Sequence, residues 1–313
     1  MRIPLTTFLL CLGVGAALAD NGRTGRPIEP VYDRIAQDLQ AGRPLVIAAY
    51  YGLWFDHNQN PDRNLNWGTY YGHARMMARV TRDRHIRRLY RHRHWQRVYA
   101  DSADVDPLRT LVYHQRVKPN GRWRAAGVTT PFDAYLVMQA FASREEAAIR
   151  MTRTLRQSAD HRLTLDDGVV IDVGAAQIAG YFGHNLFYDY DNFEWDGLRS
   201  IPGAPTAAKG VFAVGCKTGR VPGFNEVLGP NVFALLYSKT LMAAEGYSTL
   251  ALTDGVLRHL DGRQMVAFGN RTYAYFQRLG KPDRRVGKPF VSHEYLLFPR
   301  ASKAKARALD TGP

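Results

Sequence analysis

The sequence predicts an α/β fold with three layers, in which helices flank both faces of a mostly parallel sheet. Short apolar runs that stop at turn residues are typical of strands buried on both faces of such a sheet. These runs alternate along the chain with segments of helical periodicity. The 313 residues are 45% hydrophobic and 22% charged, which places the chain among globular proteins rather than disordered or fibrous ones.

Each element is predicted from its local pattern, in chain order. Apolar runs define the strands, and the clearest helix start is Ser143, where Glu145 and Glu146 in the first turn form a capped beginning. The expected order is a helix around 32–39, a strand at 44–52, a polar loop at 53–66, a helix at 67–80, one or two extended segments within 97–117, a strand at 135–141, a helix at 143–157, strands ending at 184 and 216, a strand at 233–237, and helices at 249–260 and 262–279.

The first 19 residues have the pattern of a cleavable export signal. Arg2 supplies a short positive region, Phe8 to Leu18 is apolar, and Ala17-Leu18-Ala19 is a small-x-small cleavage site. We therefore expect a periplasmic or secreted protein, cut after Ala19, with no transmembrane segment, because the apolar stretch is too short for a stable span. The expected divisions are a signal peptide at 1–19, an N-terminal extension at 20–43, one α/β domain at 44–300 and a basic tail at 301–313.

Cysteine usage singles out one residue. The chain has two cysteines, and Cys11 lies in the predicted signal, so Cys216 is the only one expected in the exported protein. It cannot form an intramolecular disulfide, and an odd thiol in an oxidising compartment is either buried or used. A buried core cysteine is one interpretation, since free cysteine is among the most buried residue types.

Two predicted strands stop on reactive side chains. Ile178–Gly183 leads directly into His184, and Val211–Gly215 leads into Cys216. In open α/β sheets the functional crevice lies at the carboxyl ends of the strands. If these strands are neighbours, an imidazole and a thiol share that crevice, and this pair is sufficient for acyl transfer through a thioester.

These two blocks resemble the motifs of the caspase-like (clan CD type) cysteine peptidases, which include caspases, legumains, gingipains and clostripains. That family has a hydrophobic block ending in His-Gly, followed by a second block ending in a small residue and Cys. The chain is more similar still to a set of bacterial proteins of this type, which share Asn64-Leu65-Asn66-Trp67-Gly68 and the segment from Leu241 to Tyr247. The resemblance covers residues 44–280 and implies a caspase-like fold.

The same resemblance implies a mechanism on a peptide or protein substrate. Cys216 would attack the scissile carbonyl, and His184 would protonate the leaving amine. Backbone N–H groups of Cys216 and of the residue after His184 would bind the oxyanion. The family has Gly at that second place and this chain has Asn185, which is among the few residues that tolerate a left-handed backbone. The alternative for His184 is a structural histidine bonded to Asp189.

Two features bear on substrate preference. Arg63 could recognise an acidic side chain before the cut, whereas the loop carrying Asp189 and Asp191 could recognise a basic one. The acidic loop is preferred because it directly follows His184. A solvated loop is the competing interpretation for these carboxylates.

The densest charge cluster is basic and suggests a second function class. It includes Arg84, Arg87, Arg88 and Arg91, and the whole chain carries a net charge of +14. Such a segment can dock on an anionic surface or polymer, so the alternative function is a catalytically inactive caspase-like module with an anionic partner. A solvated basic face is the simpler explanation. No motif predicts a metal or cofactor, and Gly215-Cys216-Lys217 departs from a phosphate-binding P-loop, which needs Gly before Lys.

Overall fold

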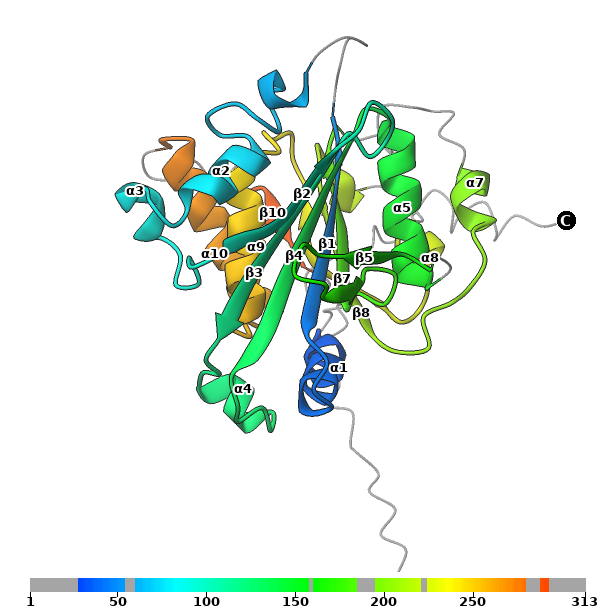
Figure 1. Ribbon diagram of the computed structural model, residues 1–313. Coiled ribbons are helices and arrows are strands. Elements are labelled where there is room, and N and C mark those ends of the chain that lie inside the picture. Colours follow the sequence, from blue (N-terminus) through cyan, green and yellow to red (C-terminus); the bar gives the residue numbers. More distant parts are fainter. Residues whose placement is uncertain are drawn as a thin grey trace, which may run out of the picture. The chain divides into compact units, whose positions relative to one another are not determined.

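An eight-stranded mixed sheet forms the centre of the part of the chain that the computed structural model describes, with the order β10-β9-β8-β7-β1-β4-β3-β2 (Figure 1). The described residues are 28–53, 60–157, 160–184, 195–220, 224–279 and 288–292. They belong to one unit, residues 25–296. The predicted signal peptide and the basic tail at 301–313 lie outside the described residues.

Five neighbouring strands of this sheet run parallel, and antiparallel strands border them on both sides. Every residue of β1, β7, β8 and β9 is buried, as expected of strands that are covered on both faces. The strands are β1 (Leu45–Gly52), β2 (Gln96–Ser102), β3 (Arg109–Val117), β4 (Phe132–Phe141), β7 (Ile178–Gly183), β8 (Lys209–Val214), β9 (Val232–Ser238) and β10 (Phe290–Val291). A separate hairpin pairs β5 (Arg162–Thr164) with β6 (Val170–Asp172).

Helices cover both faces of the sheet, so the predicted three-layer α/β fold is confirmed (Figure 1). Alternate side chains of β1 enter different cores: Ile47 and Tyr51 pack with one set of helices, and Val46 and Tyr50 pack with the other. The first set is α1 (Glu29–Gln40), α2 (His73–Arg79), α9 (Gly246–Leu257) and α10 (Gly262–Phe276). The second set is α5 (Arg144–Arg156), α7 (Trp195–Arg199) and α8 (Phe224–Leu228). Short elements are η1 (Pro61–Arg63), α3 (Arg84–Arg87), α4 (Gly121–Ala125) and η2 (Thr218–Arg220).

The largest error in a predicted boundary concerns the helix expected from Trp67, which begins only at His73. The carbonyl of Asn64 accepts backbone N–H groups from Trp67, Gly68 and Thr69, which folds this stretch into turns instead. The helix expected at 249–260 also lies earlier, at Gly246–Leu257. The sequence pattern also did not predict α3, α4 or the β5–β6 hairpin. No helix among the described residues is long and apolar enough to cross a membrane.

His73 shows how closely α2 and α9 pack over the sheet. Its side chain is buried, with ring centroids 4.5 Å from Tyr51 and 4.7 Å from Phe182. Nε2 lies 2.9 Å from the carbonyl oxygen of Ala244, which can only accept, so Nε2 carries the hydrogen and Nδ1 accepts from the Thr249 hydroxyl at 2.7 Å. Burial lowers the pKa of His73 to about 3, so the folded protein holds a neutral imidazole.

We expect His73 to make the fold sensitive to acid. The unfolded chain protonates this histidine near pH 6.5, whereas the folded protein does so only near pH 3, so the free energy of unfolding falls as the pH is lowered through that window. The loss from pH 7 to pH 5 should be about 2 kcal/mol for this residue. Urea denaturation at both pH values measures it.

The matched variant is His73→Phe, which keeps a ring beside Tyr51 and Phe182 and removes the titrating group. At pH 7 the free energy of unfolding of the variant should be lower than that of the unmodified protein. Between pH 7 and pH 5, however, the variant should lose about 2 kcal/mol less of this free energy than the unmodified protein does. Equal losses in the two proteins would show that His73 is not held neutral by burial.

Candidate active site at the ends of β7 and β8

The strands that lead to His184 and Cys216 are neighbours in the sheet and run parallel (Figure 1). In their register Phe182 lies opposite Val214. His184 and Cys216 each come two residues later, so the two residues leave the sheet at the same carboxyl edge and at corresponding positions. The fold therefore brings this predicted pair to one place, although the two are 32 positions apart in the sequence.

A constrained backbone turn sets the position of His184. Gly183 has a φ of +153°, and a Cβ added there would lie 2.5 Å from the carbonyl oxygen of Gly52 on β1. Glycine is required because an L side chain would be both strained and too close to a backbone atom. The hydroxyl of the buried Tyr181 donates to the carbonyl of His184 at 2.8 Å. This bond fixes the backbone of His184, the residue after Gly183.

A second turn, held by hydroxyl groups, sets the position of Cys216. The N–H of Gly215 donates to Thr218 Oγ1 at 3.2 Å and to Ser238 Oγ at 3.3 Å, and both hydroxyls also bond its carbonyl. Lys217 has a φ of +58°, and its N–H donates to the carbonyl of Thr240 at 2.9 Å. The strand β8 therefore ends in a sharp turn that is hydrogen-bonded to residues at and just after the end of β9.

The residue Cys216 is partly buried, and its sulfur lies beside backbone polar groups. Its Sγ is 3.4 Å from both the backbone N and the carbonyl oxygen of Met242, in the loop before α9. Tyr273 on α10 interacts electrostatically with Cys216 and with the carboxyl group of Glu245. Burial raises the pKa of that carboxyl group, although bonds from Tyr247 and Gln277 act against the shift. The N–H of Met242 is a donor that can stabilise negative charge on sulfur.

The remaining predicted site residues do not all fall within the described chain. Asn185, Asp189 and Asp191 lie outside the described residues, so the oxyanion role of Asn185, the acidic specificity loop and an Asp189–His184 bond stay predictions. Arg63 is exposed in η1, which follows the strand β1 at the same end of the sheet.

The four arginines proposed for an anionic partner lie in α3 and in the segment that follows it. Arg84 and Arg87 belong to α3, and Arg88 is exposed just after it. Of the four, only Arg91 is among the described residues that line a surface cavity. Binding of an anionic partner by these four arginines stays a prediction.

Sequence reasoning did not identify several residues around the thiol. Met242 lies in the segment from Leu241 to Tyr247, which was noted for its similarity to other proteins, and Thr218 directly follows Gly215-Cys216-Lys217. These two residues therefore had a local signal in the sequence. Ser238 and Tyr273 carry no local signal. They reach Gly215 and Cys216 only because β9 and α10 pack beside the end of β8.

Comparison of the chain with protein-family models, curated protein sequences and solved structures gave no match. Within the described ranges, no group of three or more His, Cys, Asp or Glu side chains is arranged to hold a metal ion. The chemistry of the site must therefore be argued from its own residues.

Gly183→Ala tests whether the turn before His184 is as constrained as its geometry indicates. The methyl group would meet the carbonyl of Gly52 at 2.5 Å and the Tyr181 hydroxyl at 2.7 Å. The matched control is Gly168→Ala, because Gly168 also has a positive φ, +82°, but nothing lies within 4 Å of its added Cβ. We expect Gly183→Ala to cost about 2 kcal/mol more unfolding free energy than the control. Equal losses would contradict the close approach.

Proposed function

We propose that the protein is a cysteine-dependent hydrolase of peptide substrates, of the caspase-like type, that acts outside the cytoplasm. The observation that carries this proposal is the placement of His184 and Cys216 at corresponding positions on the ends of two neighbouring parallel strands. Two further observations support it: Cys216 is not fully buried, and it lies on a turn held by hydrogen bonds, as expected of a nucleophile that must be both reachable and held in place.

The proposed reaction runs in two steps. Cys216, as thiolate, attacks the scissile carbonyl and forms a C–S bond, while backbone N–H groups of Cys216 and Asn185 bind the oxyanion. His184, protonated, gives its proton to the departing amine as the C–N bond breaks. Water, deprotonated by His184, then attacks the thioester and releases the acid and the thiolate.

The substrate preferred in this proposal carries a basic residue before the cut, because the loop that carries Asp189 and Asp191 directly follows His184 in the chain. Recognition of an acidic residue by Arg63 is the alternative. A peptide library with every residue type before the cut distinguishes them, and Asp189→Asn or Arg63→Gln should reduce hydrolysis only of the substrates each residue recognises.

The competing proposal from another class is an inactive module that keeps the fold and binds an anionic partner. It predicts the same strand arrangement but no reactive thiol. Reactivity of Cys216 in the native protein therefore distinguishes the two functions more directly than any further structural detail.

Thiol labelling provides that test. Native protein treated with iodoacetamide at pH 7 should be carbamidomethylated at Cys216, as located by peptide mass spectrometry. Cys216→Ala should abolish both this label and hydrolysis of library peptides. His184→Ala should slow labelling about tenfold or more, because the imidazolium that stabilises the thiolate is lost, and should reduce hydrolysis by about 10³-fold.

The control is His85→Ala, which removes an exposed histidine from α3 and should leave both rates unchanged. Circular dichroism of each variant shows whether it is folded. Labelling of Cys216 that appears only after denaturation would contradict the hydrolase and favour the inactive module, as would equal labelling rates for the His184→Ala and His85→Ala proteins.

A further inference from the structure

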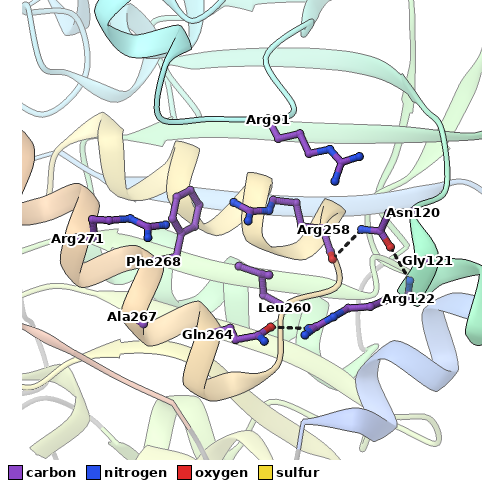
Figure 2. A pocket seen from close by; sticks show the side chains of 10 residues that line it. All are labelled: Arg91, Asn120, Gly121, Arg122, Arg258, Leu260, Gln264, Ala267, Phe268 and Arg271. Carbon is purple, nitrogen blue, oxygen red and sulfur yellow. Dashed lines mark hydrogen bonds between the residues drawn. The ribbon is translucent and has the colours of Figure 1, made fainter.

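A cationic cavity of about 610 Å³ lies at the C-terminal end of α9 (Figure 2). It is formed by segments that are distant in the sequence: the loop before β2, the start of α4, the α9–α10 connection and one face of α10. Its described lining residues are Arg91, Asn120, Gly121, Arg122, Arg258, Leu260, Gln264, Ala267, Phe268 and Arg271. The volume is within the range of small-molecule sites.

The helix α9 separates this cavity from the proposed active site. Its N-terminal end follows the loop in which Met242 contacts the Cys216 sulfur, and its C-terminal end leads into Arg258. A 12-residue helix is about 18 Å long, so the two sites are too far apart to share a small ligand.

The cavity has more positive charge than its surroundings neutralise. Among its described lining residues are four arginines and no carboxylate. Arg258 pairs with Asp254 at 3.5 Å and Arg122 lies 3.8 Å from Asp261. In the described part of the chain, no carboxylate pairs with Arg91 or Arg271. At least two guanidinium charges are therefore left for a ligand.

Hydrogen bonds from Asn120 and Asp254 hold the walls of the cavity in place. Asn120 donates from Nδ2 to the carbonyl of Arg258 at 2.9 Å and accepts the N–H of Arg122 at 2.9 Å. Asp254, buried on α9, accepts the backbone N–H of Arg91 at 3.1 Å and also that of His92, at 2.6 Å. These bonds fix the backbones that carry three of the arginines before any ligand arrives.

Phe268 holds two of the guanidinium groups. Figure 2 shows the Phe268 ring between the guanidinium groups of Arg258 and Arg271. The Cζ atoms of these arginines lie 5.1 Å and 5.3 Å from the centroid of the Phe268 ring. Such cation–π contacts orient the groups without neutralising their charge. Gln264, Phe268 and Arg271 stand at spacings of three and four along α10 and thus share one face of the helix.

The positive charge of these arginines also contributes to a lowered pKa at the neighbouring His92. His92 follows Arg91 and bonds Gln115 through Nδ1 at 3.2 Å. Its pKa is lowered to about 4, mainly by burial and further by Arg91, Arg258 and His94. A neutral His92 thus lies beside the arginine group rather than adding to it.

We propose that this cavity binds a small phosphate-bearing anion with at least two negative charges. Guanidinium groups are planar forks that bind phosphate through paired hydrogen bonds. A phosphate presents three acceptor oxygens, so it can engage several converging arginines at once, whereas one carboxylate fills a single fork. The cavity exceeds the size of one phosphate and leaves room for a second phosphate or for the rest of an ester.

Calorimetry of the full-length protein with pyrophosphate tests the proposal. We expect saturable binding of one pyrophosphate per chain, weaker at higher salt. Arg91→Gln/Arg271→Gln should weaken it about tenfold or more, because these two arginines lack carboxylate partners. Neither residue takes part in the proposed hydrolysis, so activity at Cys216 should be unchanged, and either proposal can fail without the other.

The matched control is Arg84→Gln/Arg88→Gln, which removes the same charge from exposed positions outside the cavity. Its affinity for pyrophosphate should equal that of the unmodified protein. Equal weakening by both double variants would overturn the site, since attraction would then depend only on net charge. Failure of the unmodified protein to bind pyrophosphate, or equally tight binding of malonate, would overturn the proposed phosphate chemistry.

A second measurement needs no variant. Phenylglyoxal modifies accessible arginines, and peptide mass spectrometry locates the modified positions. Pyrophosphate should protect Arg91 and Arg271 but not Arg84 and Arg88. Uniform protection, or none, would contradict a site in this cavity.

Discussion

The parallel pairing of β7 with β8 is the constraint on which the rest of the proposed chemistry depends. The register is fixed by complementary shapes: Gly180 lies opposite Phe212, and a Cβ added to Gly180 would come within 2.2 Å of the Phe212 ring. A slip by one residue would move each buried side chain to the opposite face of the sheet. Correct packing of an aromatic ring over a glycine thus determines where His184 and Cys216 leave the sheet.

The chain turns out of the sheet after β7 and after β8, and different interactions hold the two turns. On the His184 side, a glycine with a conformation closed to other residues lies against β1, and a buried tyrosine hydroxyl bonds the histidine carbonyl. On the Cys216 side, hydroxyls of Thr218 and Ser238 bond Gly215. Both turns include hydrogen bonds made by the hydroxyls of buried side chains, so loss of a bonding partner would leave a polar group unpaired and cost stability as well as position.

The helix α9 lies between the two proposed sites, and the segments that flank it contribute to both. All of its residues are buried between α2, α10 and the sheet, so it is a rigid element with no free face. The loop before its first turn contacts the thiol, and the residue after its last turn carries a cavity arginine. One packed helix thus lies between the proposed nucleophile at one end and a group of arginines at the other.

The sequence alone determined the fold class, most strands, and the two strands that stop at His184 and Cys216, because buried strands and capped helices leave local patterns of apolar and turn residues. It misplaced the start of α2, where hydrogen bonds to Asn64 override helical spacing. Only the tertiary structure made β7 and β8 neighbours, and only it brought Ser238 to the backbone of Gly215 and Tyr273 within electrostatic reach of Cys216. It also gathered Arg91 with arginines from α4 and from the α9–α10 region. These outcomes depend on packing between segments distant in the chain, which local periodicity does not encode.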